Sequence, residues 1–245
     1  MKKFLFILAL IVCCNMQAAT NYKKQIYDLF ITGNILQWEE VINKMKGESA
    51  TYSLDENIEL ITYYYGLSGH LMGKDDSKAK ELIEEALDIL KPLLKKNPEN
   101  ASLLGLSANL HGYQIAINPI KAATLAHSML VQAKRAPKLA PEDPEANIWG
   151  ANILFYMPNA LGGNTKQAKV YYNKALQLYE SDESLRADNW MYLQLIVTLG
   201  LVEEKAENYT GALEYFHHVC ELFPSYPYVR EVLIPRVEEK RQNAQ

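Results

Sequence analysis

Apolar residues recur at three- and four-residue spacing along most of the chain, whereas sustained alternation of apolar and polar residues is hard to find. The spacing is clearest in Lys78–Leu94, Lys166–Tyr179 and Thr210–Leu222. A period near 3.6 residues gathers apolar positions on one face of a helix, whereas a half-buried strand has a period of two. The pattern therefore predicts an all-α protein.

Clusters of Gly, Pro, Asn, Asp and Ser interrupt the apolar pattern and supply turns between the predicted helices. The helices come in pairs: Tyr22–Ile31 with Leu36–Met45, Leu54–Met72 with Lys78–Leu94, Ala101–Ile117 with Ile120–Leu139, Glu145–Met157 with Thr165–Glu180, and Leu185–Glu207 with Thr210–Leu222. A last helix, Tyr228–Arg241, ends in charged residues that suit a terminal cap.

The chain also resembles itself at intervals. A bulky residue precedes a glycine in four of the predicted first helices, at Tyr65-Gly66, Leu104-Gly105, Trp149-Gly150 and Leu199-Gly200. The segment that begins at Gly66 matches the segment that begins at Gly105 in its Gly, Leu, Ser and final Leu. Such repetition predicts a helical array, in which each pair buries its apolar face on its neighbours.

The residues of the last pair resemble the tetratricopeptide repeat (TPR) family. The matching positions are Leu199-Gly200, Ala212, Phe216, Val219 and Pro224. Two earlier second helices carry part of the same pattern, at Ala79, Ile83 and Ala86 and at Ala168, Tyr172 and Ala175. The resemblance implies a TPR-like solenoid of about five helix pairs with a capping helix, which binds partners and seldom catalyses.

The fourth unit departs from the last by an insertion that contains Pro158–Gly163. With this insertion, the segment from Glu145 to Tyr179 resembles the helical T component of tripartite TRAP-type import systems. That resemblance implies a transporter partner and a central pore that holds an apolar ligand.

The first residues predict export. Lys2 and Lys3 precede an uncharged apolar run, and Ala18 and Ala19 suit cleavage, so residues 1–19 read as a signal peptide and 20–245 as one solenoid domain. We expect a periplasmic or secreted protein. Lipoprotein anchoring through Cys13 or Cys14 is the less favoured alternative, because neither cysteine follows the small residue that acylation prefers. No later segment is long enough to span a membrane.

Removal of this leader leaves Cys220 as the one cysteine, which excludes an intramolecular disulfide in the mature chain. It also leaves 23 basic and 29 acidic residues, a net charge of −6 that argues against a nucleic-acid partner.

The sequence offers little chemistry for catalysis. The five histidines lack metal-binding spacing, and His217 and His218 point about 100° apart on one helix, so we expect one to be partly buried and the other solvated. Gly162-Gly163 lacks the lysine of a phosphate loop, and no Gly-x-Ser-x-Gly segment occurs. We therefore predict no catalytic residue, no metal site and no cofactor.

The remaining candidate is the concave face of the array. If each repeated glycine takes the eighth place of the family's repeat, the resemblance puts mainly apolar positions on that face. Its polar and aromatic members are the predicted binding residues: Tyr63, His70, Ser102, Asn109, Asn147, Phe155 and Gln194. The run Tyr63-Tyr64-Tyr65 takes successive directions around a helix, so one tyrosine should be core and another should face solvent or a partner.

Two functions are consistent with these features. The first is a non-enzymatic exported scaffold or adaptor that binds a protein or peptide partner through the concave face. The second is a periplasmic carrier, or transporter-associated component, that binds an apolar small molecule.

Overall fold

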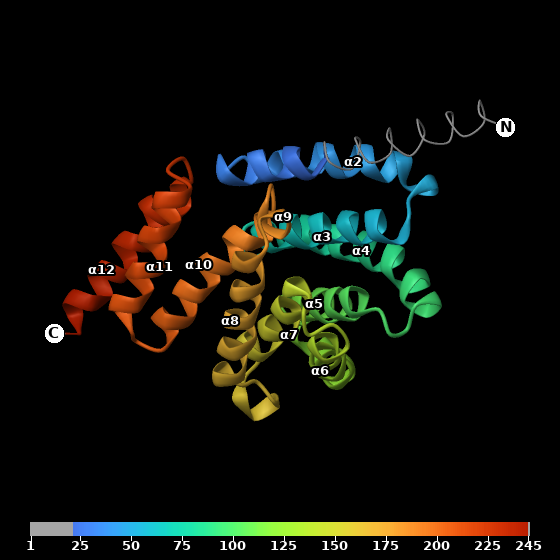
Figure 1. The fold of residues 1–245 in the computed structure, drawn as a ribbon. Coiled ribbons are helices and arrows are strands. Elements are labelled where there is room, and N and C mark those ends of the chain that lie inside the picture. The colour runs from blue at the N-terminus through green and yellow to red at the C-terminus, as the bar shows by residue number, and fades with distance from the viewer. Residues whose placement is uncertain (1–21, 245) are drawn as a thin grey trace.

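The computed structural model describes residues 22–244, and every regular element in that range is a helix. The predicted leader, with Cys13, Cys14 and Ala18-Ala19, lies outside the described residues. The helices are α1 at residues 22–31, α2 (Trp38–Glu48), α3 (Leu54–Leu71), α4 (Asp76–Lys96), α5 (Ala101–Ile117), α6 (Ala122–Leu139), α7 (Pro144–Tyr156), α8 (Thr165–Ser181), α9 (Glu183–Arg186), α10 (Trp190–Lys205), α11 (Tyr209–Leu222) and α12 (Ile234–Asn243). The predicted all-α class is confirmed (Figure 1).

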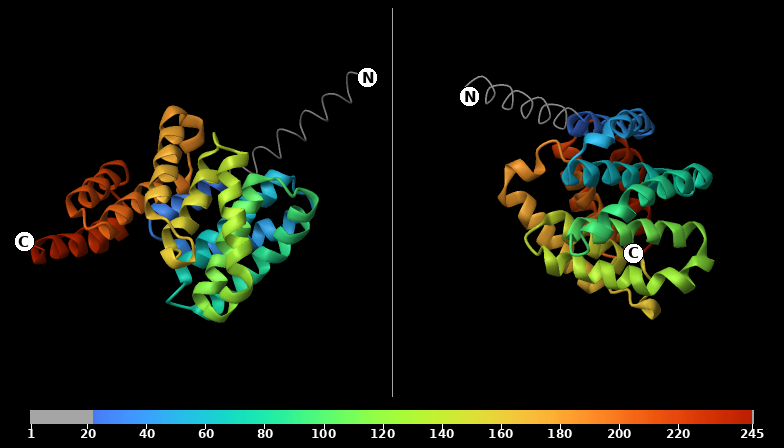
Figure 2. Two further views of the ribbon diagram at one scale, coloured as in Figure 1. Left: turned by 90° about the horizontal axis from the view of Figure 1, so that it is seen from below. Right: turned by 90° about the vertical axis from the view of Figure 1, so that its right-hand side faces the viewer.

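Successive helices pack as antiparallel pairs, and the pairs stack into a solenoid-like array. The pairs are α3 with α4, α5 with α6, α7 with α8, and α10 with α11. The first helices α3, α5 and α7 also pack on one another and form an inner layer, while the second helices lie outside it (Figures 1 and 2). Because the inner helices are covered on most sides, α5 is buried without interruption from Leu103 to Leu110. By contrast, α4 buries one stripe only, as expected for an outer helix.

Close approach between neighbouring helices explains two of the repeated glycines. A Cβ atom added at Gly105 would lie 2.5 Å from the Cβ of Trp149, and one added at Gly150 would lie 2.8 Å from the carbonyl oxygen of Ala133. Any larger residue would force these helices apart. The glycine pattern in the sequence is therefore a packing pattern.

One predicted helix is broken in two. The sequence predicted a single helix from Leu185 to Glu207, but the chain forms α9, then a turn, then α10. Asp188 has a φ of 51°, which an α-helix does not accommodate, and the side chain of Asn189 accepts a hydrogen bond from the backbone N–H of Met191 at 2.9 Å. The asparagine thus begins α10 as its N-cap, a role that competes with continuing a helix.

The two ends of the described chain meet. Gly33, after α1, lies against Pro227, since a Cβ atom there would be 3.3 Å from the proline ring. Phe30 stacks on Tyr226 with ring centroids 5.3 Å apart, and the ring centroids of Trp38 and Trp190 are 5.1 Å apart. The first helix pair therefore packs against α10 and against the segment that follows α11.

The last helix is fastened by charge. Glu204 of α10 is buried and accepts hydrogen bonds from Arg236 and Lys240 of α12, at 2.5 and 2.9 Å. Burial alone would raise the pKa of Glu204, but the bonds from Lys240 and Arg236 outweigh it and hold the pKa below its ordinary value. A π-helical turn, η5 (Val229–Leu233), precedes α12, so the predicted capping helix Tyr228–Arg241 is present with an irregular first part.

Within residues 22–244, no helix has both the length and the apolarity that a membrane-crossing segment requires.

Candidate functional site

The two predicted binding asparagines are buried, and their amides already have partners. The amide of Asn109 donates to the carbonyl oxygens of Gly105 at 2.8 Å and Trp149 at 3.0 Å, which joins α5 to α7. The amide of Asn147 donates to the carbonyl oxygens of Pro141 at 3.0 Å and Asp143 at 2.7 Å, and so shapes the turn before α7. In this conformation both side chains support the fold.

The other five predicted binding residues are divided between core and surface. Tyr63 and Phe155 are buried, whereas His70, Ser102 and Gln194 are half-buried. Burial, helped by Lys74, lowers the pKa of His70, and the Gln194 side chain donates to Thr198 at 3.3 Å. The seven residues do not converge on one pocket among the described residues, and their binding role stays a prediction.

Replacing Asn109 by alanine separates the structural role from the binding role. We expect the free energy of unfolding to fall by about 1–3 kcal/mol, because the carbonyl oxygen of Trp149 loses its buried donor. Urea denaturation of this variant provides the measurement, with Ser102→Ala as the comparison, because Ser102 is a half-buried residue about two helical turns earlier on α5. Unchanged stability for Asn109→Ala would show that the bond to α7 is unimportant.

A cluster of four tyrosines lies where α3, α5, α7 and α8 meet. Tyr65 and Tyr113 stack with centroids 4.9 Å apart and an angle of 3° between their planes, and Trp149 meets Tyr65 edge-on at 5.0 Å. We call Tyr65, Tyr113, Tyr156 and Tyr172 the tyrosine cluster. The stacking is possible because Gly69 has no side chain, since a Cβ atom there would lie 2.5 Å from the Tyr113 hydroxyl.

Asn152 ties the hydroxyls of the tyrosine cluster together. The hydroxyl of Tyr172 donates to the Asn152 side-chain oxygen at 2.7 Å, and the Asn152 amide donates to the hydroxyl of Tyr65 at 3.1 Å. Burial is the main cause that raises the pKa of Tyr65, Tyr113 and Tyr172, so all three are neutral near neutral pH. The cluster thus offers aromatic faces and uncharged hydroxyls that can donate or accept hydrogen bonds.

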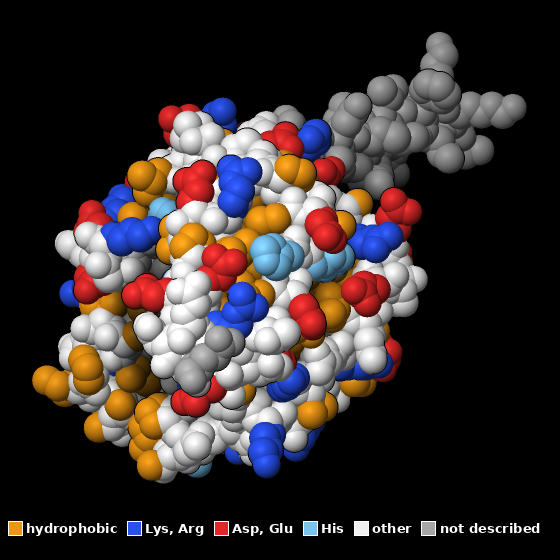
Figure 3. Space-filling model, turned by 90° about the vertical axis from the view of Figure 1, so that its left-hand side faces the viewer, with side chains coloured by type: hydrophobic (Ala, Val, Ile, Leu, Met, Phe, Trp, Pro, Cys, Tyr) orange, Lys and Arg blue, Asp and Glu red, His pale blue; other side chains and the backbone are white. Residues whose placement is uncertain are grey.

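Tyr156 brings the cluster to the surface. Its side chain is 65% exposed, yet surrounding protein atoms, and then Tyr228, still raise its pKa. The ring is therefore mostly in contact with solvent, close to the buried part of the cluster. The face drawn in Figure 3 has hydrophobic side chains gathered at its lower left. Next to Tyr156, the ammonium of Lys205 lies 4.4 Å from the ring centroid of Phe155.

Sequence reasoning singled out one segment of the tyrosine cluster. The run Tyr63-Tyr64-Tyr65 was expected to contain one core tyrosine and one that faces solvent or a partner, and the structure buries Tyr63 and Tyr64 while Tyr65 is half-buried. Tyr113 and Tyr156 were not predicted. Each is a single tyrosine near the end of an inner helix, and nothing local in the sequence places the two beside Tyr65.

A second polar group surrounds the N-terminal end of α7. Glu145 and Asp143 approach Glu59 of α3, and Lys23 of α1 is the cation whose charge acts on this group. Burial raises the pKa of Glu145 to about 7, with Asp143 as the next cause, and a hydrogen bond from Asn189 acts in the opposite direction. Burial also raises the pKa values of Glu59 and Asp143. Glu145 is therefore partly protonated around neutral pH.

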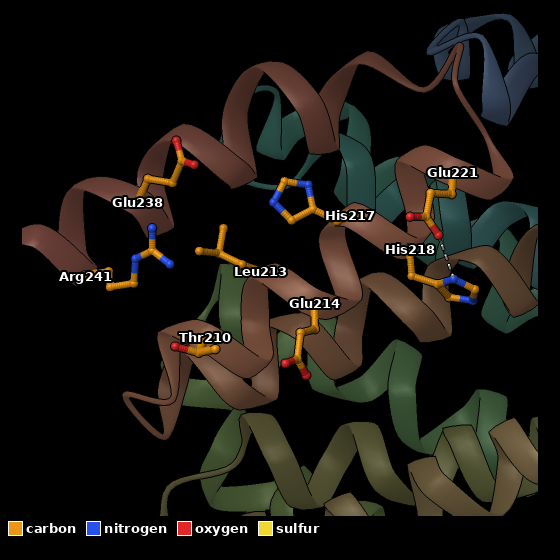
Figure 4. A pocket seen from close by; sticks show the side chains of 8 residues that line it. All are labelled: Thr210, Leu213, Glu214, His217, His218, Glu221, Glu238 and Arg241. Atoms are coloured by element: carbon orange, nitrogen blue, oxygen red, sulfur yellow. Dashed lines mark ion pairs between the residues drawn. The ribbon is translucent and has the colours of Figure 1, made fainter.

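The paired histidines do not form a site. A groove of about 390 Å³ between α11 and α12 is lined by His217, His218 and Arg241 among others. Figure 4 shows His217 directed toward α12 and His218 directed away from it, toward Glu221. Both rings are exposed, so the expectation that one is partly buried was wrong. Among residues 22–244, no three His, Cys, Asp or Glu side chains are grouped to hold a metal ion.

Comparison with known proteins gives a similarity to solved structures. No protein-family model matches the chain, and no curated protein matches it. The solved structure of the HusA haemophore from Porphyromonas gingivalis matches with a TM-score of 0.62 and 17% sequence identity, over 78% of this chain and 93% of that chain. At this identity the match shows a shared fold.

Proposed function

We propose that this protein is a non-enzymatic carrier that holds a planar, largely apolar molecule against the tyrosine cluster. The observation that carries the proposal is Tyr156, which is 65% exposed and so brings an aromatic ring of the tyrosine cluster to the surface. An exposed aromatic ring is a ready surface for stacking. The neighbouring half-buried pair Tyr65 and Tyr113 extends the same aromatic wall inward.

The side chains of the tyrosine cluster indicate which class of ligand it could bind. Rings from α3, α5 and α7 supply apolar area, and the hydroxyls supply sparse hydrogen bonds, the usual composition of a small-molecule site. Lys205 lies over the ring of Phe155, next to Tyr156 in the chain, and donates to the carbonyl oxygen of Phe155 at 2.9 Å. Its charge suits a carboxylate at the rim of the ligand. Haem has a planar apolar ring with carboxylates, and the structurally similar protein is described as a haemophore, so haem is the first ligand to test.

Titration with haem, followed by its absorption band and by tryptophan fluorescence, tests the proposal. We expect saturable binding that Tyr156→Ala weakens by about tenfold, since one stacked ring is lost. Tyr171→Ala is the matched control, because Tyr171 lies on α8 beside Tyr172 but points in a different direction around the helix. Binding that is unaffected by Tyr156→Ala, or that both variants weaken equally, would contradict this site. Iron-free protoporphyrin in place of haem shows whether the metal contributes.

A protein or peptide partner, as the sequence indicated, is the second candidate. The observation that favours it is that His70, Ser102 and Gln194 are half-buried, on the first helices of three pairs, α3, α5 and α10. With this candidate we also propose that the protein is exported to the periplasm or the medium and that its helix pairs are TPR-like. Capture of a defined partner by the wild type and its loss in His70→Ala, without any effect of Tyr156→Ala, would support this candidate over the carrier.

A further inference from the structure

Two connections on one side of the array present large apolar side chains to solvent. Ile120 lies in the 3-10 turn η3 (Pro119–Lys121) between α5 and α6, and its side chain is 84% exposed. Leu161 lies in the turn η4 (Asn159–Leu161) between α7 and α8 and is 55% exposed. We call these two residues the apolar tips. Neither tip can be explained by packing within the described chain.

The apolar tips belong to the same edge of the molecule. The ends of α5 and α7 are aligned, because a Cβ atom at Gly112 would lie 3.3 Å from the side chain of Ile153. The η4 turn rests on α6, since a Cβ atom at Gly162 would lie 2.7 Å from Leu130. Figure 2 shows both connections on one side of the array. Tyr156, at the end of α7, lies next to η4 and so near the same edge.

The two segments that carry the apolar tips are basic in sequence. Residues 100–141 contain four basic residues and no acidic residue, and residues 146–179 contain three basic residues and no acidic residue. Of these, Lys121 follows Ile120 directly and Lys166 stands five residues after Leu161. Carboxylates of other segments lie near some of these cations, since Glu84 lines a groove with Lys121 and Glu203 pairs with Lys169.

We propose that this edge docks on the surface of a lipid bilayer with anionic headgroups, with the apolar tips inserted in the interfacial region. Protruding apolar side chains gain by leaving water for the acyl boundary, and lysines beside them attract anionic headgroups. Single residues on turns insert without exposing unpaired strand edges or burying a charge. Docking of an acidic protein would instead require a continuous apolar surface that fits the partner, whereas the apolar tips are two separate projections. The inference does not rest on the proposed ligand.

Sedimentation of the purified full chain with vesicles tests this docking edge. We expect binding to phosphatidylcholine vesicles that contain phosphatidylglycerol, weaker binding to phosphatidylcholine alone, and further weakening at high salt. The double variant Ile120→Ser with Leu161→Ser should lower the partition coefficient by about tenfold or more. Lys121→Gln with Lys166→Gln should reduce binding to the anionic vesicles only.

Leu36→Ser with Leu222→Ser is the matched control, because these side chains are 63% and 44% exposed at other places in the fold. Circular dichroism checks that every variant is folded. The proposal is overturned if the wild type binds neither kind of vesicle, or if the control pair reduces binding as much as the tip pair. Loss of binding to a purified acidic protein in the tip pair, with no vesicle binding by the wild type, would assign the edge to protein recognition instead.

Discussion

Replacing Trp38 by alanine is expected to lower the free energy of unfolding by about 3–5 kcal/mol, the usual range for removal of a large buried aromatic side chain. Trp38 is completely buried, and its ring centroid lies 6.0 Å from that of Phe30 and 5.1 Å from that of Trp190. Its indole N–H donates to the carbonyl oxygen of Ile26 at 3.1 Å. The substitution therefore opens a cavity where the first helix pair meets α10, and it removes a buried donor.

Urea denaturation followed by circular dichroism measures this effect. Leu36→Ala is the control, because Leu36 is 63% exposed only two residues away and should change the free energy of unfolding by less than about 0.5 kcal/mol. A loss below about 1 kcal/mol for Trp38→Ala would show that the first helix pair contributes little to the stability of the array.

Glu145→Gln is expected to stabilise the protein by about 1–3 kcal/mol at slightly alkaline pH and to have little effect at acidic pH. Glutamine keeps the shape of the side chain and its hydrogen-bonding capacity toward Asn189. It removes the negative charge that burial and Asp143 disfavour. The upper end of the expected stabilisation corresponds to the full difference between the folded and unfolded pKa values of Glu145. Solvent near this half-buried side chain screens its charge and makes the stabilisation smaller.

The direction with pH follows from the two pKa values of Glu145. The value is about 7 in the folded protein and near the ordinary 4.5 in the unfolded chain. Because the folded state binds the proton more tightly, the wild type keeps its full stability below the unfolded value and loses it as pH rises toward 7. The neutral glutamine has no such loss, so the two stability curves should diverge between these values and run parallel above them.

Thermal unfolding at a series of pH values gives this comparison. The groups that face Glu145 are Asp143, Glu59 and Lys23, with Tyr63 and Tyr179 close enough for its charge to raise their pKa values. Glu40→Gln provides the control, since Glu40 is exposed on α2. Equal shifts for the two variants at all pH values would show that Glu145 is ordinarily solvated.

The fold could be predicted well wherever local pattern decides it. Turn residues and apolar spacing placed α5 at its observed bounds, and the repeated glycines pointed to close helix packing that the contact of Gly105 with Trp149 explains. The pattern failed at Asp188 and Asn189, because apolar residues on both sides continue the helical period through a turn. At this point the N-cap side chain of Asn189 determines the backbone conformation, and a hydropathy pattern does not detect capping.

The site was harder to predict because it depends on contacts between distant segments. Reading the concave face from repeat positions selected Asn109 and Asn147, and both amides are used by neighbouring backbone carbonyls. Tyr65, Tyr113 and Tyr156 come from three helices, and their meeting depends on the offset between helix pairs. Single-helix periodicity gives the direction of a side chain but not its neighbour across the array.

The contact between Gly33 and Pro227 joins residues about 190 positions apart in the chain, so it forms late whatever the order of the other helices. Pairs in an open array can fold as soon as their neighbours exist. Here the first helix pair is synthesised long before its partner residues. Its aromatic side chains, such as Phe30, stay incompletely covered until Tyr226 has been synthesised. A chain shortened before that tyrosine should therefore be prone to aggregate, although most of its helices are intact.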